Sequence, residues 1–123
     1  LAHSNLAVVG GFWPGQSTFA VASLCAQAIK APRMIVATDV AGVYDSDPKV
    51  NPTARLIPRM TYSELWKILA VTSHRAGEYQ LIDSVGLTML ERSRTRLLFI
   101  DGRNIENIKR AILYSEAGTI VEP

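Results

Sequence analysis

The 123 residues give room for one domain with a hydrophobic core and leave none for a second. Hydrophobic residues make up 48% of the chain and charged residues 20%, which is the balance of an ordinary folded, soluble domain. The formal net charge of +2 is too small, and the basic residues too scattered, to indicate a nucleic-acid partner. No apolar run approaches the roughly 20 residues that span a bilayer, so we expect no membrane span.

The single cysteine, Cys25, lies in an apolar stretch and has no partner in the chain with which to form a disulfide. We therefore expect a buried free thiol and a reducing, cytoplasmic setting. The first residue is Leu1 rather than methionine, and an apolar segment follows almost at once. This start predicts that the chain is a piece of a longer one.

The amino-terminal part of the chain predicts a strand, a loop and a helix. Residues 6–9 are continuously apolar and end at two glycines, which predicts a short buried strand. The stretch 19–31 is apolar except for Ser23, Gln27 and Lys30, which recur at helical spacing. We expect a helix there with one narrow polar stripe, packed between a sheet and another layer.

The rest of the chain predicts alternating strands and helices. Residues 34–37 and 97–100 are continuous apolar runs, typical of a parallel sheet buried on both faces, and 118–121 predicts a short closing strand. The predicted helices start at Thr61 and run to about residue 70, start at Asp83 and run through residue 93, and follow Asn104 over residues 105–113. This order predicts an α/β fold with a mostly parallel sheet sandwiched by helices.

The first loop (residues 10–18) joins the predicted strand to the apolar helix and contains three glycines. Glycines let a ligand approach the backbone closely, and the free amides of a helix start, with Ser17 and Thr18, can donate to an anion. The glycine spacing fits neither a dinucleotide fingerprint nor a P-loop, and no lysine precedes Ser17. These residues alone leave a phosphate site and a plain structural turn both open.

The second loop (residues 38–49) directly follows a predicted buried strand. In open α/β sheets, ligands bind beyond the carboxyl ends of strands. Tyr44 offers a flat face on which a purine can stack, and Thr38, Asp39 and Asp47 offer polar edges. A surface turn around Asp47 and the proline after it explains the same residues equally well.

Four segments, in order, resemble the amino acid kinase family and, within it, the archaeal-type UMP kinases. The first loop resembles that branch's GG-x-x-PG-x-[ST]-T segment, and the second resembles its T-[ND]-V-D-G-V-Y-x-x-D-P segment. The other two are residues 76–83 with 91–93, and Asp101-Gly102-Arg103 with residues 118–123. The resemblance spans essentially the whole chain, and implies that residues 1–123 are the carboxyl-terminal half of a single amino acid kinase domain whose amino-terminal half is absent.

The resemblance implies ATP-dependent phosphorylation of UMP to UDP in pyrimidine nucleotide biosynthesis, with ATP bound to magnesium. For UMP it implies the residues Phe12, Trp13, Pro14, Gly15, Gln16, Ser17 and Thr18. For ATP it implies Thr38, Asp39, Tyr44 and Asp47. It places the catalytic lysine and further glycine-rich turns in the amino-terminal half, so we expect this chain to be inactive alone. It also implies a homo-oligomer, a hexamer built from dimers.

Departures from the family pattern keep other functions open. Phe19 and Ala41 stand where many members have acids, and Ser84, Gly86 and Thr88 replace a D-P-x-A-x-K pattern. One alternative is a kinase of the same fold for another acceptor, such as isopentenyl phosphate or N-acetylglutamate. Another is a non-catalytic nucleotide- or oxoanion-binding or storage relative.

The histidines predict no metal site, and Trp13 has two possible contacts. His3 and His74 show no metal-ligand spacing to each other or to Cys25, so we expect no metal site made of side chains. Trp13 could pack against a neighbouring chain as readily as against a base.

Overall fold

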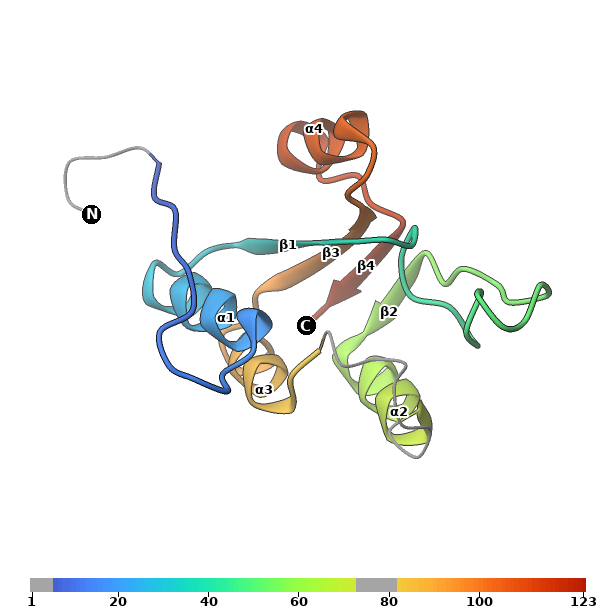
Figure 1. The fold of residues 1–123 in the computed structure, drawn as a ribbon, viewed down its shortest axis with the longest axis horizontal. Coiled ribbons are helices and arrows are strands. Elements are labelled where there is room, and N and C mark those ends of the chain that lie inside the picture. Colours follow the sequence, from blue (N-terminus) through green and yellow to red (C-terminus); the bar gives the residue numbers. More distant parts are fainter. Residues whose placement is uncertain (1–5, 73–81) are drawn as a thin grey trace.

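The computed structural model describes residues 6–72 and 82–123. This part of the chain contains eight helices and strands, which are labelled in Figure 1. In chain order they are α1 (Thr18–Ala28), β1 (Arg33–Thr38), β2 (Arg59–Thr61), α2 (Tyr62–Thr72), α3 (Ser84–Arg92), β3 (Arg96–Asp101), α4 (Ile105–Tyr114) and β4 (Thr119–Glu122). The predicted α/β class is confirmed.

The four strands form one mixed sheet in the order β1-β3-β4-β2. β1 pairs with β3 in parallel, with Thr38 opposite Asp101 at the carboxyl ends of both strands. β4 pairs with β2 in parallel and with β3 antiparallel. The sheet is therefore mostly parallel, as predicted, with one antiparallel pairing at its centre.

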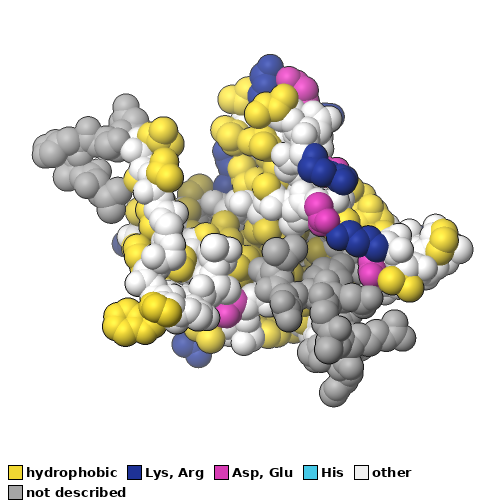
Figure 2. All heavy atoms as spheres, in the orientation of Figure 1, with side chains coloured by type: hydrophobic (Ala, Val, Ile, Leu, Met, Phe, Trp, Pro, Cys, Tyr) yellow, Lys and Arg dark blue, Asp and Glu magenta, His cyan; other side chains and the backbone are white. Residues whose placement is uncertain are grey.

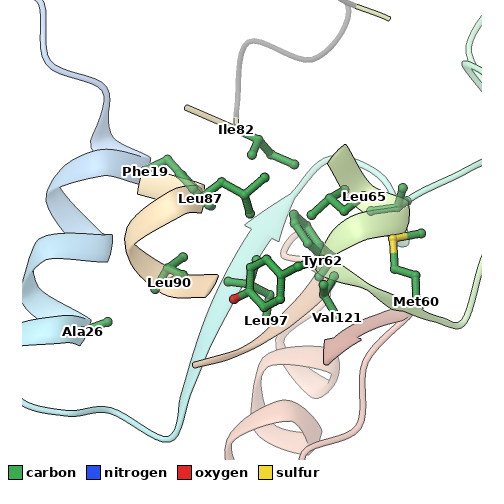
Figure 3. Close-up of a cluster of buried hydrophobic side chains, with 12 residues drawn as sticks. Phe19, Ala26, Met60, Tyr62, Leu65, Ile82, Leu87, Leu90, Leu97 and Val121 are labelled. Atoms are coloured by element: carbon green, nitrogen blue, oxygen red, sulfur yellow. The ribbon is translucent and has the colours of Figure 1, made fainter. Parts of the chain in front are cut away.

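Helices cover both faces of the sheet (Figure 1). α1, α2 and α3 lie on one face and α4 lies on the other. The larger core fills the space between the sheet and the first three helices, and Figure 3 shows many of its side chains. Its fully buried members include Leu65, Leu87, Leu90, Leu97 and Val121. A smaller core of Leu98, Ile100 and Ala111 lies under α4.

The three helix starts expected from polar residues are confirmed. At α2 the caps are reciprocal, because the Glu64 carboxylate accepts from the Thr61 amide at 2.7 Å while the Glu64 amide donates to Thr61 Oγ1 at 3.3 Å. The Asp83 carboxylate accepts from two amides at the start of α3, and Asn104 Oδ1 accepts from the Glu106 amide at 3.0 Å. Local side-chain chemistry thus decides where these helices begin.

The strand predicted over residues 6–9 is wrong for this structure. Residues 6–11 are outside the sheet, and Leu6, Val8 and Val9 are exposed, Val8 at 93%. A strand of four residues is stable only when a neighbouring strand pairs with it and another layer buries its side chains. The described part of the chain provides no such cover for Val8.

The predicted polar stripe of α1 is wrong at Ser23, which is fully buried. Its hydroxyl donates to the Phe19 carbonyl one turn earlier, at 2.7 Å, so burial leaves no polar group unpaired. The small side chain also lets α3 approach closely, since a Cβ added to Gly86 would lie 2.9 Å from Ser23 Oγ. Ala22, Gln27 and Ala28 are exposed, so one side of α1 stays uncovered.

The apolar residues of α4 are largely uncovered. Ile105 is 72% exposed and Ile112 is 50% exposed, and only Ile108 packs partly against the smaller core. Figure 2 shows hydrophobic side chains at the surface of this helix. Within residues 6–72 and 82–123, no helix has the length and apolar character of a membrane span.

Candidate functional site

The first loop forms a tight turn that leads into α1. The Gln16 amide donates to the Trp13 carbonyl at 3.1 Å, and Gly15 between them has a φ of 82°. That left-handed conformation favours glycine, because the Cβ of any other residue would lie too close to the backbone carbonyl oxygen. Phe12 and Trp13 are 60% and 77% exposed, and Figure 2 shows hydrophobic side chains at the surface of this loop.

Ser17 caps α1 in two ways. Its Oγ accepts from the Ala20 amide at 3.0 Å, and its carbonyl accepts from the Val21 amide at 3.1 Å. The amides of Thr18 and Phe19 precede those of Ala20 and Val21 in the chain, and they are the donors that this helix start offers to an anion. The Ser17 hydroxyl proton is also not used by the cap, because the oxygen accepts there. The turn is therefore both structural and able to donate to a phosphate.

The second loop begins where β1 ends. The Gly102 amide, just after β3, donates to the Thr38 carbonyl at 2.8 Å and holds the two strand ends together. The Thr38 hydroxyl is used locally, since it accepts from the Val40 amide at 3.1 Å and lies 2.9 Å from the Val40 carbonyl. Thr38 thus shapes the first residues of the loop.

Lys49 joins the two acidic residues of the second loop. Its ammonium group lies 2.6 Å from the Asp39 carboxylate, and its amide donates to Asp47 Oδ1 at 2.8 Å. The Asp47 carbonyl also accepts from the amides of Val50 and Asn51, so Asp47 organises a turn. Asp39 and Asp47 are therefore brought together through Lys49, a residue that the sequence did not single out.

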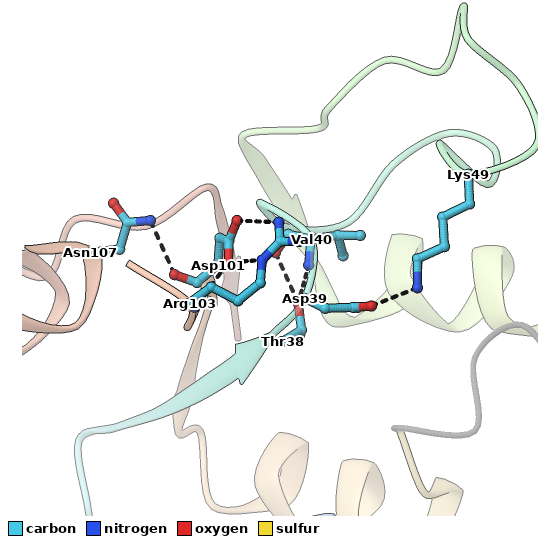
Figure 4. Close-up of polar contacts among 7 residues, drawn as sticks. All are labelled: Thr38, Asp39, Val40, Lys49, Asp101, Arg103 and Asn107. Atoms are coloured by element: carbon cyan, nitrogen blue, oxygen red, sulfur yellow. Dashed lines mark hydrogen bonds and ion pairs between the residues drawn. The ribbon is translucent and has the colours of Figure 1, made fainter. Parts of the chain in front are cut away.

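Asp101 and Arg103 form a second charged pair at the same end of the sheet (Figure 4). Arg103 donates to both carboxylate oxygens, from Nε at 2.9 Å and from an Nη at 2.7 Å. The Asn107 side chain donates to the Asp101 carbonyl at 3.1 Å. The sequence marked Asp101-Gly102-Arg103 as a motif without a role, and the parallel register of β1 and β3 places it beside Thr38.

These pairs set the charge of the site. The Arg103 guanidinium lowers the pKa of Asp101 to about 2, and Lys49 lowers the pKa of Asp39 by hydrogen bonding and by its charge. Asp39 and Arg103 also attract each other, and each weakly supports the charged form of the other. At neutral pH this end of the sheet therefore carries these four side chains in ionised form, and each cation is paired with a carboxylate: Lys49 with Asp39, and Arg103 with Asp101.

Tyr44 lies on a paired part of the connection between β1 and β2 (residues 39–58), which contains the second loop. It forms an isolated antiparallel bridge with Leu56, and the Asp45 amide donates to the Arg55 carbonyl at 3.1 Å. The Arg55 amide in turn donates to Asp45 Oδ1 at 2.9 Å, which lowers the pKa of Asp45. Tyr44 is half-buried.

A hollow of about 230 Å³ lies between the start of the second loop and α4. Its lining includes Ala41, Asp101, Asn107, Arg110 and Glu116. It therefore shares Asp101 with the charged pair at the end of β3. No role was predicted from the sequence for the α4 residues of this hollow.

The two loops flank one helix–strand unit in the sequence, because the first precedes α1 and the second follows β1. α1 runs in the opposite direction to β1, so the start of α1 lies nearer than its end to the side from which the second loop leaves (Figure 1). The third predicted segment, residues 76–83, lies outside the described residues except for Ile82 and Asp83. His3 and His74 lie outside them as well.

Residues 1–101 match the model of the amino acid kinase family. A uridylate kinase from Metallosphaera sedula is 46% identical over 122 residues, which is 98% of this chain and 54% of that protein. A uridylate kinase from Hyperthermus butylicus is 42% identical over 116 residues, or 94% of this chain and 51% of that protein. The chain thus spans about half the length of the curated relatives it matches.

Solved structures show the same likeness. The crystal structure of uridylate kinase from Archaeoglobus fulgidus superposes with a TM-score of 0.73 at 35% identity. The match covers 91% of this chain and 50% of that one. Family model, relatives and structure therefore agree, and the predicted resemblance is confirmed.

Proposed function

The chain belongs to the amino acid kinase family, and from this premise we propose that it is the carboxyl-terminal, nucleotide-binding half of a uridylate kinase. Such an enzyme transfers the γ-phosphoryl group of ATP to UMP and releases UDP and ADP. The relatives named uridylate kinase, at 46% and 42% identity, support this choice of acceptor. The observation that carries it is the first loop, which presents a capped helix start beside two exposed aromatic residues.

We propose that UMP binds along residues 12–18, with its phosphate at the start of α1. The amides of Thr18 and Phe19 and the hydroxyl proton of Ser17 would donate to the phosphate oxygens. The helix dipole adds roughly 0.3–1 kcal/mol for an anion at such a position. Phe12 and Trp13 are exposed enough to contact the uracil ring.

We propose that ATP binds at the second loop, where Thr38, Asp39, Tyr44 and Asp47 line its adenosine part. The half-buried Tyr44 offers a ring face to the adenine, and the carboxylates offer acceptors to ribose hydroxyls. Magnesium bound to ATP is usually held by phosphate oxygens, water and one or two carboxylates rather than by a protein cage. Among residues 6–72 and 82–123, no group of three or more His, Cys, Asp or Glu side chains is arranged to hold a metal ion.

Phosphoryl transfer depends mostly on positioning and on cations that stabilise the charge of the moving group. The cations beside the second loop, Lys49 and Arg103, are each paired with a carboxylate. We therefore expect the catalytic cations to come from the half of the relatives that this chain does not match. We also expect a cytoplasmic homo-oligomer, a hexamer as the family resemblance implies.

Reconstitution tests this proposal. The chain is fused to the part of the M. sedula uridylate kinase that it does not match, and UDP formation from ATP and UMP is measured. We expect turnover by the fusion, no appreciable turnover by the 123-residue chain alone, and a preference for UMP over CMP. Calorimetric titration of both proteins with UMP, CMP and ATP separates binding from catalysis.

Two outcomes would contradict the proposal. Full turnover by the isolated chain would show that the catalytic cations lie within residues 1–123. A fusion that is folded by circular dichroism but binds no nucleoside monophosphate would favour another acceptor or a storage role.

A further inference from the structure

The connection between β1 and β2 narrows at a neck, which we define as residues 43–45 paired with residues 55–57. The Ile57 amide donates to the Val43 carbonyl at 2.9 Å, and Tyr44 bridges to Leu56. Tyr44, the proposed adenine contact, is therefore part of the neck itself. An interaction that holds the neck in place therefore also holds the backbone of Tyr44 in place.

The side chain of Thr119, at the start of β4, lies across this neck. Its Oγ1 accepts from the Val43 amide at 2.8 Å and lies 2.7 Å from the Ile57 carbonyl. A hydroxyl has one proton, so that proton is donated to the Ile57 carbonyl while a lone pair takes the Val43 N–H. Thr119 is 0% exposed, so water does not compete for either bond. One buried hydroxyl thus joins both sides of the neck to the sheet.

The backbone around Thr119 is closely packed. A Cβ added to Gly42 would lie 2.4 Å from Thr119 Oγ1, and one added to Gly118 would lie 1.8 Å from the Ala41 carbonyl oxygen. Backbone therefore packs directly on backbone where the connection passes the start of β4. The Ile120 amide also donates to the Pro58 carbonyl at 2.9 Å, just beyond the neck.

We propose that Thr119 is a positioning residue of the ATP site, which holds the neck and thereby sets the place of Tyr44. The proposal rests on the proposed function, because it assigns the effect to ATP rather than to UMP. Removing the hydroxyl leaves the Val43 N–H and the Ile57 carbonyl buried without that partner, and such groups favour an opened neck. The first loop and α1 share no hydrogen bond with Thr119, so UMP binding should not depend on it.

Calorimetric titration with ATP and with UMP tests the proposal in the fusion protein described above. For Thr119→Val, which keeps the shape and removes the hydroxyl, we expect the Kd for ATP to rise roughly 10- to 100-fold. The Kd for UMP should stay within about twofold. Thr119→Ser restores the hydroxyl and should restore ATP binding. Thr88→Val in α3 makes the same chemical change away from the neck and should change neither affinity.

If Thr119 contributed only to the stability of the fold, its substitution would weaken the binding of both ATP and UMP. The proposal is overturned if Thr119→Val binds ATP as the parent does, if it loses ATP and UMP equally, or if Thr119→Ser behaves like Thr119→Val. Should Thr119→Val fail to fold, Thr119→Ala removes the same hydroxyl with less steric demand and replaces it in the comparison with Thr119→Ser.

Amide hydrogen exchange separates this proposal from the proposed function. Exchange at Val43 should be faster in Thr119→Val and normal in Thr119→Ser, with or without nucleotide. If the parent protein binds neither nucleotide, the proposed function fails, while faster exchange at Val43 still supports Thr119 as the residue that positions the neck. Unchanged exchange at Val43 overturns the positioning role itself.

Discussion

Substituting Ser17 by aspartate separates the two tasks of the α1 start. Aspartate caps helices as well as serine does, so Ser17→Asp keeps an oxygen for the Ala20 amide. A carboxylate there also interacts favourably with the helix dipole, by roughly 0.3–1 kcal/mol. We therefore expect the free energy of unfolding to stay the same or to rise. The proposed phosphate position, however, gains a negative neighbour.

The expected loss of UMP affinity follows from charge and from the lost donor. Two unit charges about 5 Å apart in a water-like medium repel by about 0.8 kcal/mol, and a phosphate monoester carries about −1.5 to −2. The repulsion is then roughly 1–2 kcal/mol. Loss of the hydroxyl bond to a charged phosphate adds roughly 1.5–3 kcal/mol. The sum, roughly 2.5–5 kcal/mol, corresponds to a Kd for UMP raised roughly 60- to 4,000-fold.

Calorimetric titration with UMP and urea denaturation measure the two effects on the same protein. Ser17→Asn keeps a capping oxygen without the charge and should bind UMP more tightly than Ser17→Asp. Asn104→Asp places the same charge at the cap of α4 and should leave the Kd for UMP unchanged. Unaltered UMP affinity in Ser17→Asp would refute the placement of the phosphate at α1.

Two further predictions concern stability. Tyr62 is 2% exposed and its hydroxyl donates to the Thr95 carbonyl, so Tyr62→Phe should lower the free energy of unfolding by roughly 1–3 kcal/mol. The control Tyr114→Phe, at a residue that is 67% exposed, should change the free energy of unfolding little. Equal effects of the two substitutions in urea denaturation would contradict the buried hydrogen bond of Tyr62. The folded-state pKa of Asp101 is lowered to about 2 by Arg103, so the stability from this pair is present above the ordinary pKa near 4 and is lost as the pH falls toward 2. Thermal melts of the parent and Asp101→Asn should therefore differ at pH 7 and converge below pH 4, and a constant difference would be the contrary result.

Helix starts were the most predictable part of the fold. Thr61, Asp83 and Asn104 each act within three residues of themselves, so their caps depend on local sequence and not on the rest of the chain. The strand β3 was predictable because a short continuous apolar run is typical of a strand that is buried on both faces of a sheet.

Errors arose where distant parts of the molecule decide burial. Ser23 looks polar in a helical pattern, yet a neighbouring helix with Gly86 at the contact makes its place an interior one. Residues 6–9 have the composition of a strand, but a strand also needs a neighbouring strand to pair with and another layer to bury its side chains. Of the candidate site, the second loop was predicted by its motif, whereas Lys49 and Thr119 act through contacts that only the folded chain creates.

The mixed sheet also determines how much of this chain must be present before its four strands can pair. Arg33 pairs with Arg96, and Arg59 pairs with Ile120, so neither parallel pairing joins neighbouring segments. β4 is the strand that links β3 to β2, and it is formed by residues 119–122. Sheets made of such distant pairings form slowly, because the entropy of closing long loops is lost before any contact rewards it. A nascent chain must therefore emerge through residue 122 before β4 can join β3 to β2, and until then these two strands expose unpaired backbone N–H and C=O groups that favour aggregation.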